Sequence, residues 1–365
     1  MPSVLLATAG YDHTVRLWEA SNGKCHRKLS YMDSQVNSLV ISADKRYIAA
    51  AGNPHTRLYD TQSNDSGPLR SFDGHVNNVN AAGFQKDGRW MYTGSDDGTL
   101  KIWDLRAPGI AREFGTCQRE YDNGAGINSV VLHPNQGELI AGDENGNIRV
   151  FDLTQNKMSY EQPSGVGSAV RSISIAADAS LAATSHDNGM VILWKLPNSR
   201  QTVSHFEERH AFQAHEQYVR VALLCVCLFL VQFNSRPLLK RCSRIRGPSP
   251  QRPPAQALKC SLSPDMSCLA TASSDSTVKL WNISDLLSGP RTPVEPATIL
   301  RGHQRWVWDC VFSLDSAYLV SASSDHTARL WDLSTGESIR EYTGHTKAVC
   351  CVALSDKEEP CRNSG

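Results

Sequence analysis

The sequence lacks an excess of charge of either sign, because 37 Lys and Arg residues balance 37 Asp and Glu residues. That balance gives no reason to expect nucleic acid or an anionic membrane as a partner. The N-terminal residues lack the basic and long apolar segments of a secretion signal, so we predict none. The longest apolar run, residues 221–233, has 13 residues, whereas a membrane-spanning helix needs roughly 18 to 20.

The sequence also lacks the motifs of common catalytic sites. It contains no Gly-x-Ser-x-Gly segment, no glycine-rich phosphate loop and no paired His and Glu metal motif. Eleven cysteines, several within strand-like runs, are typical of buried residues in a reducing compartment rather than of a disulfide framework. We therefore predict a cytoplasmic protein without enzymatic activity, metal or cofactor.

An internal repeat is the strongest feature that is present. Aromatic residues followed by a polar residue close similar segments at Trp18, Tyr59, Trp103, Phe151, Trp194, Trp281 and Trp331, with spacings of 41, 44, 48, 43, 87 and 50 residues. Before each aromatic lies an apolar run, a tight turn and an alternating segment, a pattern that predicts two antiparallel strands. Gly-His pairs precede the best copies, as at Gly302 and His303.

Repeats of this length that carry Gly-His and Trp-Asp pairs resemble WD repeats, which form β-propellers with four strands in each blade. Seven copies predict an all-β, seven-bladed WD-repeat β-propeller. The first strand-like segment resembles a second strand, and the last resembles an inner strand without a hairpin after it. We therefore expect a closing blade shared between the N- and C-termini, which leaves no open sheet edge.

The resemblance to WD repeats implies a buried hydrogen-bond network in which His contacts a hydroxyl and a turn Asp, with the Trp indole at the far end. The residues expected in it are His303, Ser323, Asp325 and Trp331; His345, Thr8, Asp12 and Trp18; His75, Asp97 and Trp103; and Asp275 and Trp281. These histidines and carboxylates are interpreted as structural rather than catalytic.

The spacing of 87 residues indicates an insert, since only one set of repeat features lies within it. Removing residues 219–256 reduces the spacing to 49 and leaves 327 residues. The insert has seven basic residues and no acidic one, so the remaining propeller carries a net charge of −7. We predict a single propeller from residues 1–218 and 257–356 and a separate tail, residues 357–365.

Three interpretations of the insert remain open. Its first residues, Val219 and Arg220, and its last, Gln256, permit GT and CAG codon ends, which favours a retained intron of 114 nucleotides. A genuine, disordered surface loop is the second. A membrane-touching basic and apolar patch is the third.

Departures from the WD consensus carry a more specific resemblance. The segments 6–18, 49–60 with Tyr59 in place of Trp, 87–97, 132–143 and 330–354 closely resemble the G-beta-subunit-like family of target-of-rapamycin (TOR) kinase complex subunits. The resemblance implies a non-catalytic subunit of both TOR complexes that binds and stabilises the kinase domain and supports nutrient and growth signalling. It also implies a cytoplasmic protein that reaches endomembrane surfaces with the kinase complex.

A partner is expected at the channel mouth, where the inner strands begin. Aligned repeats place there Gln35 and Asn37, Asn78 and Asn80, Gly126 and Asn128, Ala169 and Arg171, Tyr218 and Leu258, Trp306 and Trp308, and Ala348 and Cys350. The predicted binding rim is Gln35, Asn37, Asn78, Asn80, Tyr218, Trp306 and Trp308, because Trp and Tyr favour hot spots and amides could bond to a partner's backbone. Alternatively, one Trp plugs the channel.

A second function class stays open: a general WD-repeat scaffold or peptide-reading adaptor of the kinase-C-receptor or ubiquitin-ligase type. Such a reader is expected to carry an Arg or acidic cluster at the channel mouth. The aligned ring holds aromatics, amides and a single Arg171, which favours the kinase subunit.

Overall fold

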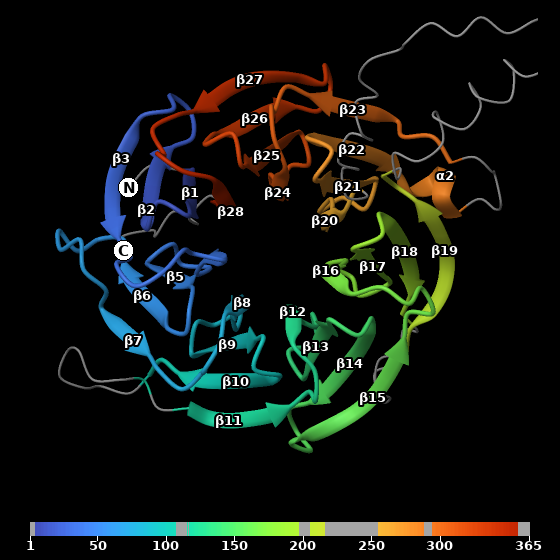
Figure 1. Cartoon of the computed structure of the whole chain (residues 1–365), viewed down its shortest axis with the longest axis horizontal. Coiled ribbons are helices and arrows are strands. Elements are labelled where there is room, and N and C mark those ends of the chain that lie inside the picture. Colours follow the sequence, from blue (N-terminus) through green and yellow to red (C-terminus); the bar gives the residue numbers. More distant parts are fainter. Residues whose placement is uncertain are drawn as a thin grey trace, which may run out of the picture.

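The computed structural model describes residues 4–106, 115, 117–196, 205–215, 255–287 and 294–356. In these residues, seven four-stranded antiparallel sheets surround a central channel (Figure 1). The alternation of apolar and small residues in each repeat therefore forms the predicted seven-bladed propeller. We number the blades from the one that contains the N-terminal strands.

Blade 1 combines both ends of the described chain. Its inner strand is β28 (Val349–Ser355), which pairs with β1 (Leu5–Gly10) and is followed by β2 (Thr14–Glu19) and β3 (Cys25–Ser30). Figure 1 shows the last strand beside the first. The prediction of a closing blade shared between the termini is thus confirmed.

Blades 2 to 7 each run outward in chain order from the channel. Blade 2 is β4 (Ser38–Ile41), β5 (Tyr47–Ala51), β6 (Thr56–Asp60) and β7 (Arg70–Phe72); blade 3 is β8 (Val79–Phe84), β9 (Trp90–Ser95), β10 (Thr99–Asp104) and β11 (Cys117–Asp122); blade 4 is β12 (Ile127–Leu132), β13 (Glu138–Asp143), β14 (Asn147–Asp152) and β15 (Lys157–Pro163).

The remaining blades keep the same order. Blade 5 is β16 (Val170–Ile175), β17 (Leu181–His186), β18 (Met190–Lys195) and β19 (Glu207–Gln213); blade 6 is β20 (Ala257–Leu262), β21 (Cys268–Ser273), β22 (Thr277–Asn282) and β23 (Thr298–Arg301), with the short helix α2 (Ile283–Leu287); blade 7 is β24 (Val307–Phe312), β25 (Tyr318–Ser323), β26 (Ala328–Asp332) and β27 (Glu337–Tyr342).

The hydrophobic core lies mainly between neighbouring blades. Phe212 of blade 5 packs against Trp281 of blade 6, with ring centroids 4.7 Å apart. Close packing between the blades requires small residues on the second strands. For example, a Cβ at Gly94 would lie 2.5 Å from a methyl of Val130 in the next blade. Burial of these faces is the main source of stability.

The channel mouth is the end at which the inner strands begin. The loops that enter each inner strand and the turns between the second and third strands form this surface, which we call the mouth face. The turns between the inner and second strands form the opposite, lower face. Within the part of the chain that the structure describes, no helix has the length and apolar character needed to cross a bilayer.

The predicted insert and the tail, residues 357–365, lie outside the described residues, apart from Ala255 and Gln256. The described residues on either side of the gap are close in space. The carbonyl oxygens of His215 and Ala255 lie 2.4 and 2.8 Å from the point where a Cβ on Gly189 would stand. The chain therefore leaves and re-enters blade 6 at one place on the mouth face.

Candidate functional site: the channel mouth and its buried supports

Four blades contain a complete buried network of Trp, hydroxyl, His and Asp. In blade 7, Trp331 Nε1 donates to Ser321 Oγ at 2.8 Å, and Ser321 Oγ lies 2.7 Å from His303 Nε2. His303 Nδ1 lies 2.7 Å from Asp325 Oδ2. The other sets are Trp18, Thr8, His345 and Asp12 in blade 1; Trp103, Thr93, His75 and Asp97 in blade 3; and Trp281, Thr271, His215 and Asp275 in blade 6.

One assignment from the sequence was wrong. The hydroxyl in blade 7 is Ser321, not Ser323, whose Oγ instead donates to Arg305 O and accepts from Asp325 N. Both serines lie on the same side of β25 because side chains in a strand alternate with a period of two. A constant offset of ten residues before the Trp, as between Thr8 and Trp18, identifies the correct residue.

Sequence reasoning also left residues out. Two bonding hydroxyls, Thr93 and Thr271, were not assigned, and neither was His215, which lies just before the gap in the chain. Each turn Asp is followed two residues later by a Thr whose N–H and hydroxyl both donate to the same carboxylate oxygen: Thr14, Thr99, Thr277 and Thr327. The repeated Asp-x-Thr spacing was the available signal.

In each network, the histidine Nδ1 lies against the carboxylate and Nε2 lies against the hydroxyl. With its proton on Nδ1, the ring donates to the carboxylate and accepts the hydroxyl proton at Nε2, while the hydroxyl oxygen accepts from the indole. Burial lowers the pKa of His75 despite the opposing hydrogen bond and charge of Asp97. Burial opposes ionisation of Asp97, but hydrogen bonds from Thr99 and His75 lower its pKa to about 2.

The networks of blades 1, 3 and 7 also hold a mouth loop in place. Asp325 Oδ2 accepts from Gln304 N, and the equivalent bonds run from Val76 N to Asp97 and from Thr346 N to Asp12. In blade 7, this loop continues directly into Trp306, three residues after His303. The buried network thus determines where the exposed tryptophan lies.

The two predicted rim tryptophans occupy different environments. Trp306 is 38% exposed, and its ring centroid lies 5.4 Å from that of Trp308. Trp308 is half-buried, lines the central cavity of about 720 Å³ and donates from Nε1 to Ser324 Oγ at 2.6 Å. Trp308 therefore forms part of the channel wall, whereas Trp306 presents its ring at the mouth face.

The predicted rim amides bond within the propeller. Asn37 Nδ2 donates to Val79 O at 3.4 Å, and Asn80 Nδ2 donates to Ile127 O at 3.0 Å. Asn128 Nδ2 repeats the contact toward Val170 O in the next blade at 2.9 Å. These amides link blades 2 to 5 within the propeller, and contacts of Asn37 and Asn80 with a partner's backbone stay a prediction.

The remaining predicted rim residues are partly accessible or undescribed. Gln35 and Asn78 are both half-buried, and Asn78 Nδ2 donates to Asp96. Tyr218 lies outside the described residues. Its expected place is taken by Gln256, because Ser274 N donates to Gln256 O just as Ser324 N donates to Trp306 O.

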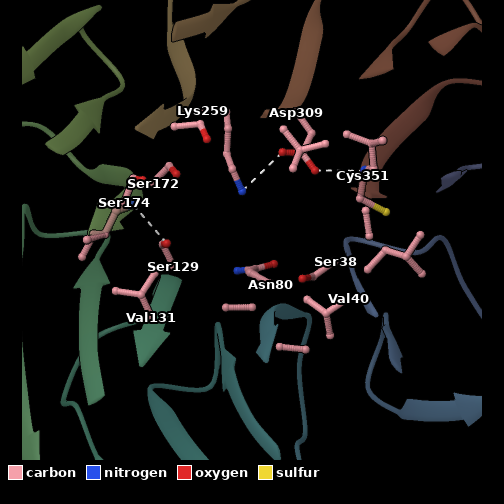
Figure 2. Close-up of a pocket in the computed structure, with 18 of the residues that line it drawn as sticks. Ser38, Val40, Asn80, Ser129, Val131, Ser172, Ser174, Lys259, Asp309 and Cys351 are labelled. Carbon is pink, nitrogen blue, oxygen red and sulfur yellow. Dashed lines mark hydrogen bonds and ion pairs between the residues drawn. The ribbon is translucent and has the colours of Figure 1, made fainter. Parts of the chain in front are cut away.

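The channel wall below the mouth combines aliphatic residues such as Val40 and Val131 with several serines and one ion pair. Lys259 Nζ lies 3.3 Å from Asp309 Oδ1, and Asp309 Oδ2 accepts from Val352 N at 3.0 Å (Figure 2). Together they link blades 6, 7 and 1. Nearby, burial raises the pKa of the Cys350 thiol to about 12, which makes it a poor nucleophile.

Three of the seven blades lack the complete network. Blade 4 has Ala141, Asn145 and Phe151 at the hydroxyl, Asp and Trp positions, and buried Asp143 accepts from the backbone N–H groups of Asn145 and Asn147 instead. Blade 5 keeps Thr184 and Trp194 but takes its histidine, His186, from β17. In blade 2, Tyr59 replaces the Trp and donates to Ser30 O.

Comparison with known proteins agrees with this architecture. The family model of the WD domain, G-beta repeat, matches residues 66–104, 115–152, 256–282 and 294–332. The Arabidopsis thaliana target of rapamycin complex subunit LST8-1 is 47% identical over 305 residues, which cover 84% of this chain and 83% of that protein.

Two relatives match over nearly the whole length. The Schizosaccharomyces pombe target of rapamycin complex subunit wat1 is 42% identical over 97% of this chain and 96% of its own length. Mouse target of rapamycin complex subunit LST8 is 41% identical over 97% of this chain and 95% of its own. The chain therefore belongs to the LST8 family of WD-repeat proteins.

Proposed function

We propose that this chain is a non-catalytic subunit of TOR kinase complexes, shared by complex 1 and complex 2, and that its mouth face binds the kinase domain. Three relatives with 41 to 47% identity are named as TOR complex subunits. Within this role, the protein would stabilise the kinase domain, support nutrient and growth signalling, and act in the cytoplasm or on endomembranes with the kinase.

The observation that carries the binding site is the exposed ring of Trp306. Large aromatic groups are usually buried in a protein of this size, and five other tryptophans are at most 2% exposed. Trp306 lies beside Trp308, with the two ring planes at 52° to each other, on a loop fixed by the His303 network. An aromatic group held rigidly in this way loses little conformational entropy on binding, which is typical of a hot spot.

The peptide-reading alternative is less well supported. A reader of charged peptides is expected to carry an Arg or acidic cluster within the ring of aligned channel-mouth positions. The guanidinium of Arg171 instead makes two hydrogen bonds to Asp187, at 2.5 and 2.7 Å. The aligned ring therefore offers aromatic surface rather than a free charged pocket.

Trp306→Ala tests the proposal. Loss of a hot spot costs about 2 kcal/mol or more, so affinity for recombinant TOR kinase domain should fall roughly thirtyfold. Trp306→Ala with Trp308→Ala should abolish capture of the kinase from lysate. Tyr318→Ala is the matched control because Tyr318 is also 38% exposed but lies on the lower face. Equal affinities of the folded Trp306→Ala variant and the unaltered chain would refute the site.

A further inference from the structure

The mouth face carries exposed charges of opposite sign on its two sides. On the mouth side, blades 3 and 4 present three exposed acidic residues: Asp96 and Glu144 in turns, and Asp122 at the end of β11. Residues 73–78, 96–98, 123–126 and 144–146, which form the mouth loops and turns of these blades, contain no Lys or Arg. We call Asp96, Asp122 and Glu144 the acidic arc.

The loops of blades 7 and 1 have the opposite character. Arg305 and Lys347 are exposed there, next in the chain to Trp306 and Ala348. The acids in these loops, Asp12 and Asp325, have side chains only 3% and 8% exposed and are paired with His345 and His303. Arg305 and Lys347 together with Trp306 form what we call the basic aromatic arc.

The two arcs face each other across the channel. Figure 1 places the inner strands of blades 7 and 1, β24 and β28, across the channel from β8 and β12 of blades 3 and 4. Neither arc is neutralised by the other, because the channel separates them. A segment bound across the mouth would therefore meet fields of opposite sign at its two ends.

We propose that the kinase segment bound at the mouth carries acidic residues at one end and basic residues at the other. It therefore binds across the channel in a single orientation. An apolar side chain lies on Trp306, acidic residues lie beside Arg305 and Lys347, and basic residues lie over Asp96 and Glu144. This orientation rests on the proposed function. The reversed orientation would place like charges together at both ends, which opposes binding and so selects one direction.

The charges should act mainly on the rate of association. Exposed rim charges steer diffusional encounter, and their effect is screened by salt. Asp96→Asn with Glu144→Gln keeps the size of both side chains while removing two charges. Association with recombinant TOR kinase domain should slow about tenfold at low salt, and its salt dependence should weaken. Arg305→Gln with Lys347→Gln should have a similar effect.

A matched control removes two negative charges elsewhere. Asp87 on the lower face and Glu208 on the outer strand β19 are both exposed. Asp87→Asn with Glu208→Gln makes the same change in net charge, so it should leave the association rate within about twofold of the unaltered chain. A comparable loss of rate in this control would show that net charge, rather than the acidic arc, controls encounter and would overturn the proposal.

Cross-linking tests the direction itself. A photo-reactive amino acid at Asn145, next to Glu144, should capture a basic segment of the kinase domain, and one at Thr346, next to Lys347, should capture an acidic segment. The opposite pattern would overturn the orientation. Wild-type association rates in both charge variants, combined with weak binding of Trp306→Ala, would also overturn it while leaving the proposed function intact. Failure of the unaltered chain to bind would refute the proposed function.

Discussion

Blades 7 and 4 have the same four strands and the same pairing, yet only blade 7 contains the buried network. Blade 4 has Ala141 and Phe151 where blade 7 has Ser321 and Trp331. The network is therefore not what makes a sheet of this shape. Its additional effect is on the loop before the inner strand, which it attaches to the blade through His303 and Asp325.

Blades 4 and 7 also differ in the loop that leads into the inner strand. The loop that leads into blade 4 is held by more local hydrogen bonds. Asn123 Nδ2 donates to Ala125 O, and Gly126 N donates to Glu144 Oε1. That loop contributes Gly126 to the mouth, whereas the loop of blade 7 contributes Trp306. The loop that carries the exposed aromatic ring is thus attached to its blade by a buried network, which the loop of blade 4 lacks.

The largest loss of stability is expected from a deletion in blade 1, where the network joins the two ends of the described chain. Deleting residues 345–365 removes β28 and also takes His345 from Asp12 and Thr8. Because this exposes a sheet edge and a part of the core, we expect loss of the cooperative fold. Thermal unfolding and solubility measure this effect. Deleting only residues 357–365 is the control; if the longer deletion melts like this control, the closure argument is wrong.

A smaller but still large effect is expected from breaking one network. His303→Ala leaves Ser321 and the buried carboxylate of Asp325 without their ring partner, which should cost about 2 to 4 kcal/mol of unfolding free energy. Asn123→Ala, the corresponding change in blade 4, should cost about 1 kcal/mol or less. Chemical denaturation compares the two. Equal losses would mean that the network adds nothing beyond ordinary loop hydrogen bonds.

The networks should also make stability sensitive to acid. The pKa values of Asp97 and Asp275 are lowered from 3.8 to about 2, so their stabilisation is present above pH 3.8 and is lost as the pH falls toward 2. Burial lowers the pKa of His75 below 6.5, so protonation of the unfolded chain starts to oppose folding below that pH. We expect the unfolding free energy to fall from pH 7 through pH 3.

Asp97→Asn supplies the control for that titration. The variant lacks one of the shifted carboxyl groups, so its stability should fall less steeply than that of the unaltered chain below pH 4. Denaturation curves of both proteins across the pH range give the two slopes. Parallel curves would show that the carboxylates of the networks do not control acid stability.

The sequence predicted the architecture well because each repeat contains its own strand and turn signals. The seven aromatic residues that close the repeats, from Trp18 to Trp331, were enough to predict seven blades. The assignment of Ser323 failed because two residues on one face of a strand look alike in sequence. The role of Asn80 was missed for a different reason: its bond to Ile127 O depends on the distance between two blades, which no single repeat encodes.

The smallest effect on stability is expected from removing residues 219–256, which we propose are dispensable for the fold. Four positions separate the network His from the first buried residue of the inner strand in three blades: His75 and Val79, His303 and Val307, and His345 and Val349. Deleting 219–256 restores that spacing between His215 and Ala257. The adjacent positions of His215 and Ala255 support the same join.

Comparison of the full and the 327-residue chains tests this prediction. Their unfolding free energies should agree within about 0.5 kcal/mol, since Ala255 is the only described core residue within the deleted segment. The deletion also places Tyr218 in sequence register with Trp306, so affinity for the kinase domain should be equal or higher. Sequencing transcripts across the codons for Tyr218 and Ala257 distinguishes a retained intron from a genuine loop. A lower stability or weaker kinase binding of the shorter chain, or the absence of any transcript lacking the segment, would show that the insert is an integral element of blade 6.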